Sequence, residues 1–136
     1  MKFLILFLLF VSIISLAQSR YAMKKAALIR LRLYCESTTF ANPLLILKVR
    51  RGDFTVDDDK VKKYAFCVYK TLGMATDEGL GDKEAGLKLI SSPTDPAKFG
   101  AAFDACNNQT GDSPNEKIWK FLVCYNNEYP GDISAL

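Results

Sequence analysis

The sequence contains no histidine among its 136 residues. Histidine is the commonest general base and a frequent zinc ligand, so its absence excludes histidine-based triads and zinc sites built on imidazole. Glycine-rich phosphate loops are also missing, and no spacing marks two carboxylates as an acid and base pair. We therefore expect no enzymatic activity, no cofactor and no metal site.

One acidic cluster needs separate consideration as a calcium site. Residues 57–59 are three consecutive aspartates, but they lack the spaced oxygen ligands and the glycine of a calcium loop. They stand where a helix is predicted to begin, and negative charge stabilises the positive end of a helix dipole. We favour this helix-capping interpretation.

Long apolar runs are scarce, with one exception near the N-terminus. Residues 3–16 are almost entirely apolar, but this run is shorter than the ~20 residues of a membrane span. Ser15 and Ala17 are small residues at positions −3 and −1 of a cleavage site. The pattern predicts a secretory signal peptide over residues 1–17 and one mature domain over residues 18–136, with a short membrane anchor as the alternative.

Cysteine occurs four times, always after the predicted signal peptide. An even number in a secreted chain implies disulfides, here two, and counting alone leaves three connectivities open. The remaining 119 residues suffice for one domain with its own core. The cysteines are Cys35, Cys67, Cys106 and Cys124.

Apolar periodicity predicts an all-α fold of about six helices. The central helix, residues 55–73, has Thr55 as its N-cap, a buried stripe that includes Cys67, and Gly73 as a left-handed stop. No stretch alternates polar and apolar residues for long enough to be a strand. The other predicted helices cover residues 19–36, 44–51, 82–90, 96–106 and 113–129.

Three of these helices share a start signal, an N-cap residue followed by proline. The signals are at Asn42, Asp95 and Ser113, and Glu116 completes a capping box with Ser113. Asp82 is a further predicted N-cap. Each signal fixes where one predicted helix begins.

Two predicted helices carry distinctive stretches around a cysteine, KKYAFCVYKTLG at residues 62–73 and EKIWKFLVCY at residues 116–125. The intervals between successive cysteines are 31, 38 and 17 residues. Both the stretches and the intervals resemble those of insect odorant-binding proteins. That family usually has six cysteines, and the two missing ones fall on Lys63 and Asn115. The chain therefore resembles the four-cysteine, or minus-C, type, whereas chemosensory proteins place their last two cysteines much closer together.

The resemblance implies a fold and a function together. It implies helices around an apolar cavity, bridges Cys35–Cys67 and Cys106–Cys124, and a secreted carrier of small hydrophobic molecules such as odorants or pheromones. The expected location is sensillum lymph or another body fluid. The expected partners are the ligand and an odorant receptor or membrane surface, with no nucleic acid. The expected state is a monomer or weak homodimer.

Apolar residues at helical spacing ordinarily form a core, so only the resemblance makes them candidates for a ligand cavity. Tyr69 and Tyr125 add hydroxyls that suit a polar group on the ligand. Asn108 begins an N-x-T sequon and is a candidate glycosylation site. The full ligand-binding set is Leu28, Leu31, Phe54, Tyr69, Met74, Leu80, Ile90, Phe99, Phe103, Phe121, Leu122 and Tyr125.

Charge is unevenly distributed along the chain. Residues 18–51 hold eight basic and one acidic residue (+7), whereas residues 52–136 hold nine basic and fourteen acidic residues (−5). A basic face can meet an anionic surface or partner, although a solvated face is the commoner outcome. The alternative function is a secreted interaction protein of saliva, venom or haemolymph, with a filled core and a basic docking face. A closed apolar void of roughly a few hundred Å³ distinguishes the carrier from this alternative.

The absence of histidine also constrains ligand release. No side chain here has an ordinary pKa between about 5 and 8, so a histidine switch is excluded. We expect ligand affinity to stay flat from pH 8 to about 6 and to weaken only toward about pH 4–5. A sharp loss near pH 6.5 would instead indicate a perturbed acid such as Asp104 or Glu128.

Overall fold

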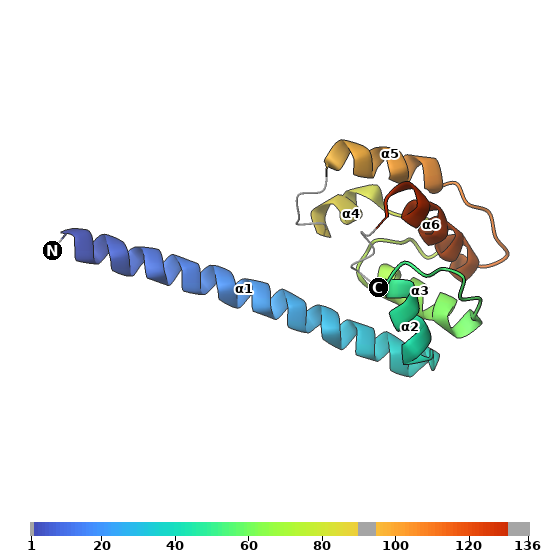
Figure 1. Cartoon of the computed structure of the whole chain (residues 1–136), viewed down its shortest axis with the longest axis horizontal. Coiled ribbons are helices and arrows are strands. Elements are labelled where there is room, and N and C mark those ends of the chain that lie inside the picture. Colours follow the sequence, from blue (N-terminus) through green and yellow to red (C-terminus); the bar gives the residue numbers. More distant parts are fainter. Residues whose placement is uncertain (1, 90–94, 131–136) are drawn as a thin grey trace. The chain divides into compact units, whose positions relative to one another are not determined.

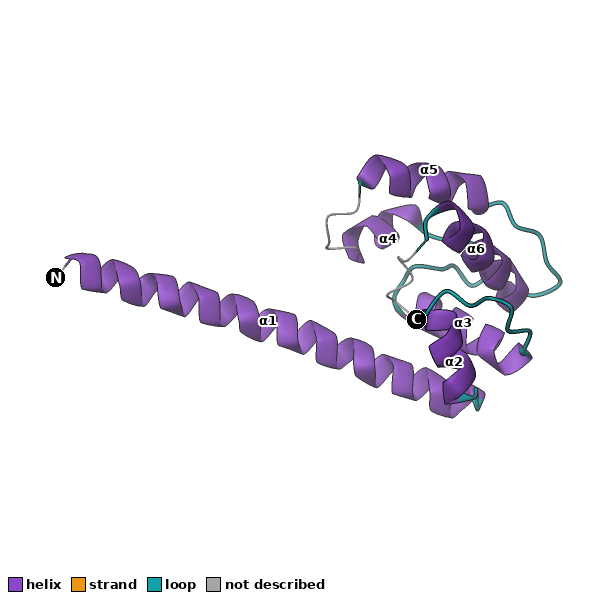
Figure 2. Ribbon diagram, in the orientation of Figure 1, coloured by secondary structure: helices purple, strands orange, loops and turns teal. Residues whose placement is uncertain are grey.

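The computed structural model describes residues 2–89 and 95–130 (Figure 1). These residues form six helices and no β-strand, with one isolated antiparallel bridge between Ala75 and Gly81 (Figure 2). The predicted all-α class is confirmed. The helices are α1 (Lys2–Thr39), α2 (Pro43–Arg50), α3 (Asp59–Thr71), α4 (Lys83–Leu89), α5 (Pro96–Cys106) and α6 (Pro114–Glu128).

The chain divides into two compact units, Met1–Leu31 and Arg32–Leu136. The second unit contains the end of α1 and all the later helices. The predicted start of the first helix at Ser19 is wrong, because α1 already begins at Lys2. No glycine or proline interrupts the sequence between these two positions. Across the described ranges, no helix is both long and apolar enough to cross a membrane.

The first helix also ends three residues later than predicted, at Thr39. Hydroxyl groups in the last turn donate back to carbonyls about one turn earlier in the helix. Thr38 and Thr39 both donate to the carbonyl of Cys35, at 3.2 and 2.6 Å. Phe40 follows with φ +54°, a left-handed conformation that stops the helix.

The predicted N-caps of α2, α5 and α6 are confirmed. Asn42 accepts from the Leu44 N–H at 2.9 Å, Asp95 accepts from that of Ala97 at 3.0 Å, and Ser113 accepts from that of Glu116 at 3.3 Å. A proline is the first residue of each helix. Fixed φ and a missing N–H cost nothing at this position, which is why the signal was reliable.

The predicted N-cap of α3 is wrong. Asp58, not Thr55, caps the helix and accepts from the Val61 N–H at 2.9 Å. Thr55 is engaged in a turn, where its hydroxyl and its N–H both donate to Asp53 Oδ1, at 2.5 and 3.1 Å. The predicted stop at Gly73 is confirmed by its φ of +72°.

The core is centred on the contact between α3 and α6. The predicted stripe on α3 is buried, except that Cys67 is only half-buried. Helix α6, on which Ile118 and Leu122 are fully buried, packs on α3. Helix α5 packs on another part of α6, and α4 packs on α5. Figure 1 shows α5 beside α6 and α4 beside α5. The buried members of the α3 stripe are Val61, Tyr64, Ala65 and Val68.

Candidate ligand-binding site

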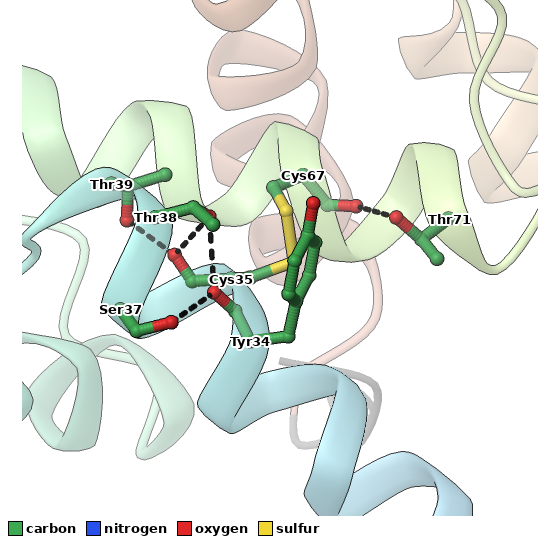
Figure 3. Close-up of a disulfide and its surroundings, with 7 residues drawn as sticks. All are labelled: Tyr34, Cys35, Ser37, Thr38, Thr39, Cys67 and Thr71. Atoms are coloured by element: carbon green, nitrogen blue, oxygen red, sulfur yellow. Dashed lines mark hydrogen bonds between the residues drawn. A yellow bond between two sulfur atoms is a disulfide. The ribbon is translucent and has the colours of Figure 1, made fainter.

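Two disulfides hold the helices around the candidate site. Cys35 at the end of α1 is bonded to Cys67 in α3, with a Cα–Cα distance of 5.8 Å (Figure 3). Cys106 at the end of α5 is bonded to Cys124 in α6, with a Cα–Cα distance of 5.7 Å. Both predicted pairings are therefore confirmed, and no cysteine remains free.

Aromatic side chains fill the contact between α5 and α6. The ring of Phe103 lies 4.9 Å from that of Phe121, and the Phe99 ring lies 5.8 Å from both Phe103 and Tyr125. Phe121 and Tyr125 stack at 5.8 Å. We call these four residues the aromatic cluster. All four are buried, and most of the ring pairs are tilted or edge-on, which is the favoured geometry for aromatic rings.

Glycines on and before α4 allow close approach to the aromatic cluster. A Cβ added at Gly86 in α4 would lie 2.9 Å from Phe99 Cζ and 3.8 Å from Met74 Cε. A Cβ at Gly81 would lie 2.6 Å from Phe103 Cζ. Only a residue without a side chain lets the backbone come this near to the two rings. The backbone at Gly81 and Gly86 therefore forms one wall of the site, against Met74, Phe99 and Phe103. We call these two glycines the glycine wall.

One asparagine fixes this wall to the end of α5. The side chain of Asn107 accepts from the Gly81 N–H at 2.7 Å and donates to the Gly81 carbonyl at 3.0 Å. Both hydrogen-bonding groups of one peptide residue are satisfied by one amide. The turn before α4 is therefore held in register with α5.

An ion pair joins the first turns of α3 and α6. Lys62 Nζ lies 2.8 Å from Glu116 Oε1 and 2.7 Å from Asp57 Oδ1, and its side chain is only 11% exposed. Hydrogen bonds to Asp57 and then Glu116 raise the pKa of Lys62 above its ordinary value. The same Lys62 contact lowers the pKa of Asp57. The capping-box glutamate is thus engaged with the neighbouring helix.

This ion pair lies next to the two positions where the family's other disulfide was expected. Lys63 follows Lys62 in α3, and Asn115 precedes Glu116 in α6. The 2.8 Å contact between Lys62 and Glu116 brings these two turns together, in agreement with the alignment. The closeness of Lys63 and Asn115 themselves stays a prediction.

A second charged group lies on the other side of α3. The pKa of Tyr64 is above its ordinary value, mainly because the side chain is buried. The charges of Arg32 and Arg50 lower this pKa, and the charge of Glu36 raises it. Burial is also the main reason why the pKa of Arg32 is below its ordinary value, with Arg50 contributing. The end of α1, the end of α2 and the middle of α3 therefore meet in a basic environment.

The structure buries most of the predicted ligand-binding residues that belong to the second unit. Phe54 is half-buried and lies 5.2 Å from the ring of Trp119. Buried candidates outside the aromatic cluster are Tyr69, Met74 and Leu122.

Three other candidates are partly or largely exposed. Leu80 is 41% exposed, because it lies in the turn where Thr76 N–H donates to its carbonyl at 2.8 Å. Leu28 and Leu31 are half-exposed on the part of α1 that belongs to the first unit. Ile90 lies outside the described residues.

A surface depression of about 390 Å³ lies along another face of α6. It is open to solvent and mixes polar and apolar groups, and it contains none of the predicted ligand-binding residues. It therefore differs from the closed apolar void expected of a carrier. Its lining residues are Gln109, Lys120, Val123, Cys124, Asn127 and Glu128.

The chain belongs to the PBP/GOBP family, whose model matches residues 18–128. The match begins at the residue that follows the predicted cleavage site and includes all four cysteines. No sequence among curated proteins matches the chain. The recognised resemblance is thus confirmed at the level of the family.

Solved structures of insect proteins share the fold. The fatty acid binding protein OBP56a from the oral disk of the blowfly Phormia regina has a TM-score of 0.65 and 21% identity, covering 78% of this chain and 91% of its own. The Locusta migratoria odorant binding protein lmigOBP1 has a TM-score of 0.67 and 23% identity, with 81% and 84% covered. Odorant binding protein 5 of Apis mellifera has a TM-score of 0.68 and 19% identity, with 82% and 93% covered.

The sequence interpretation missed the glycine wall and its asparagine. Gly81 was interpreted only as part of a turn, Gly86 was passed over within a helix, and Asn107 was taken as a helix end. Glycine inside a helical pattern lowers helix stability relative to alanine and can have a packing reason, so Gly86 was the available signal. The pairing of Asn107 with Gly81 spans 26 residues and had no local signal.

Proposed function

We propose that this chain is a secreted carrier that binds one small hydrophobic molecule against the aromatic cluster of α5 and α6. The observation that carries the proposal is the chemistry of the interior. Every buried side chain among the described residues is apolar or aromatic. Such an interior favours ligands that water solvates poorly, and the tyrosines provide its polar groups.

The two disulfides support the same function. They tie α1 to α3 and α5 to α6, so the helices stay together when side chains between them move. Membership of the PBP/GOBP family agrees with this proposal. The blowfly relative is described as a fatty acid binding protein, which makes long-chain fatty acids one ligand class to test.

In this proposal the ligand lies between the aromatic cluster and the glycine wall. Met74, Phe99 and Phe103 move to admit it, while Tyr69 and Tyr125 are the candidate hydrogen-bonding residues. The signal peptide over residues 1–17 is removed and Gln18 becomes the N-terminus. The carrier acts as a monomer or weak homodimer without enzymatic activity.

The direct test uses the protein as secreted by cultured eukaryotic cells. Intact mass gives the N-terminus and shows whether Asn108 is glycosylated. Native mass spectrometry then identifies retained lipids or volatiles, and a fluorescent naphthylamine probe gives an affinity that fatty acids or volatiles displace. Phe103→Trp, which narrows the proposed space, should weaken probe binding, whereas the exposed-site control Leu87→Trp should not.

A second candidate is the interaction protein with a filled core. The close packing of the aromatic rings is the observation that favours it. If no small molecule is retained and neither the probe nor any fatty acid binds, the carrier proposal is overturned in favour of this alternative.

A further inference from the structure

Helix α2 has one buried face and one exposed face that is not polar. Ile46 and Val49 point into the core and are buried. On the opposite side, Leu44 is 71% exposed and Leu47 is also exposed. A helix with apolar side chains on both sides has a second apolar surface, which the core does not use.

The residue at the start of this surface is more unusual. Phe40 is 78% exposed and has φ +54°, a conformation that side chains other than those of asparagine and aspartate rarely adopt. A large apolar ring therefore stands in water at the turn between α1 and α2. We call Phe40, Leu44 and Leu47 the apolar ridge.

Cations flank the apolar ridge. Lys48 follows Leu44 by four residues and therefore lies on the same side of α2, and Arg51 is the C-cap residue at the end of the helix. Residues 37–52 contain three basic residues and no acidic residue. The pKa of Asp53, the next carboxylate along the chain, is lowered by its hydrogen bonds from Thr55 and, to a smaller extent, by the charge of Lys48. Apolar side chains framed by cations are typical of helices that lie in a membrane interface.

We propose that the apolar ridge docks on an anionic lipid surface, with Phe40 and Leu44 inserted among the acyl chains and Lys48 and Arg51 on the headgroups. Charge complementarity favours this partner, because each basic residue near an anionic bilayer adds attraction. A symmetric contact with a second copy would instead place two basic faces against each other. The prominence of Phe40 also suits insertion into lipid.

This proposal is independent of the hydrophobic ligand, since Leu44 and Leu47 lie on the side of α2 opposite to its buried face. Its test measures the binding of the secreted protein to vesicles of phosphatidylcholine alone or mixed with phosphatidylserine. We expect binding to the anionic vesicles that falls when salt rises from about 0.1 to about 0.5 M. Brominated lipids should quench the tryptophan fluorescence of the Phe40→Trp variant more than that of the wild-type protein, whose single tryptophan, Trp119, is buried.

Two pairs of variants test the apolar part. Phe40→Ser with Leu44→Ser should weaken vesicle binding by at least about tenfold. Leu80→Ser with Leu87→Ser, which removes two exposed leucines elsewhere, should leave it unchanged. Circular dichroism checks that all variants keep their helices.

Two further pairs of variants test the charge, and each pair removes two positive charges. Lys48→Gln with Arg51→Gln should weaken binding to anionic vesicles about tenfold or more, whereas Lys60→Gln with Lys98→Gln should have a much smaller effect. The proposal is overturned if the wild-type protein does not bind anionic vesicles. It is also overturned if the two pairs of charge variants weaken vesicle binding equally. It is also overturned if the apolar-ridge variant abolishes a dimer seen by sedimentation, since the occupant is then a second copy.

Discussion

Helix α6 contacts two interiors of different chemistry. It packs on α3, where Val61 and Val68 are fully buried and Tyr64 is the one aromatic residue of the stripe, and Ile118 and Leu122 are fully buried on α6 itself. Against α5 it packs Phe121 and Tyr125 on two phenylalanines. Compact aliphatic side chains interlock with little room to move, whereas flat rings can tilt or slide and leave space. The comparison suggests that the α3 side maintains the fold and the α5 side adapts to a ligand.

The largest expected effect on stability comes from truncating one buried side chain in each interior. Phe103→Ala on the α5 side should lower the free energy of unfolding by about 3–5 kcal/mol, and Ile118→Ala on the α3 side by about 2–5 kcal/mol. The two variants should differ in how much stability they regain when a ligand is added. An apolar probe should restore part of the stability of Phe103→Ala, because it occupies the space left by the ring, and none of the loss in Ile118→Ala. Denaturant unfolding with and without probe measures both, and equal rescue would contradict the comparison.

Removing each disulfide should cost similar amounts. Replacing Cys35 and Cys67 with alanine opens the longer loop, and the chain-entropy estimate is a loss of about 3.7 kcal/mol, against about 3.2 kcal/mol for Cys106 and Cys124. Ligand affinity should separate them further, falling more for the second pair because it holds the aromatic cluster. Thermal unfolding and probe titration give the two readings. A larger affinity loss on the α3 side would reverse our assignment of the two interiors.

A third cross-link would stiffen the α3 side. Lys63→Cys with Asn115→Cys should form a bridge, because the Lys62–Glu116 ion pair holds these turns together, and should raise stability by roughly 2–4 kcal/mol. Peptide mapping without reduction establishes the bridge. Probe affinity should stay unchanged, since the new bond lies away from the aromatic cluster. Free thiols in the purified variant would show that the alignment with the six-cysteine pattern fails.

Two glycine substitutions form a matched pair on the α5 side. Gly86→Ala should destabilise by about 1–3 kcal/mol and weaken ligand binding, because its Cβ would crowd Phe99 at 2.9 Å. Gly100→Ala should stabilise by about 1 kcal/mol, since a Cβ there meets nothing within 4 Å and alanine is the better helix former. Stabilisation by both changes would mean that the glycine wall is not tight.

The smallest expected effect is that of pH. The pKa of Asp57 is lowered by Lys62, so the stability it contributes is present above the ordinary aspartate pKa of about 3.9 and is lost as pH falls through its lower folded value. The pKa of Lys62 is raised, so its contribution is present below about 10.4 and is lost only at higher pH. Stability and affinity should be flat between about pH 5 and 9.

Asp57→Asn sharpens this expectation. The difference in stability between wild type and variant should stay constant over that range and shrink below about pH 4. This pH is lower than the interval of about pH 4–5 in which the sequence predicts that ligand affinity weakens. Asp112→Asn, an exposed control, should show no such trend. A difference that disappears near pH 6.5 would contradict the assignment.

Much of the fold was predictable because its signals are local. N-caps followed by proline define where α2, α5 and α6 begin, and a stripe of apolar residues defines the buried face of α3. The start of α3 was misplaced because Thr55 and Asp58 are both acceptable caps, and only the engagement of Thr55 with Asp53 decides between them. The end of α1 was misplaced because Phe40 ends it in the left-handed conformation, a position where the sequence signal is usually glycine or asparagine.

The site was less predictable than the fold. Composition and periodicity identified Phe99, Phe103, Phe121 and Tyr125 as apolar and inward, and nothing in them distinguishes a core from a cavity wall. The wall opposite these rings consists of glycine backbone and one distant asparagine. Contacts of this kind depend on where the chain returns in space, which periodicity does not encode.

Complete pairing of the cysteines has a consequence for the lifetime of the protein outside the cell. Disulfide exchange begins with attack by a thiolate, and this chain has no free thiol to start it. The choice among three connectivities is therefore made once, during oxidation, where the shorter loop between Cys106 and Cys124 is the easier one to close. Afterwards a molecule that opens to admit or release its cargo can recover only the same connectivity, so repeated use does not scramble it.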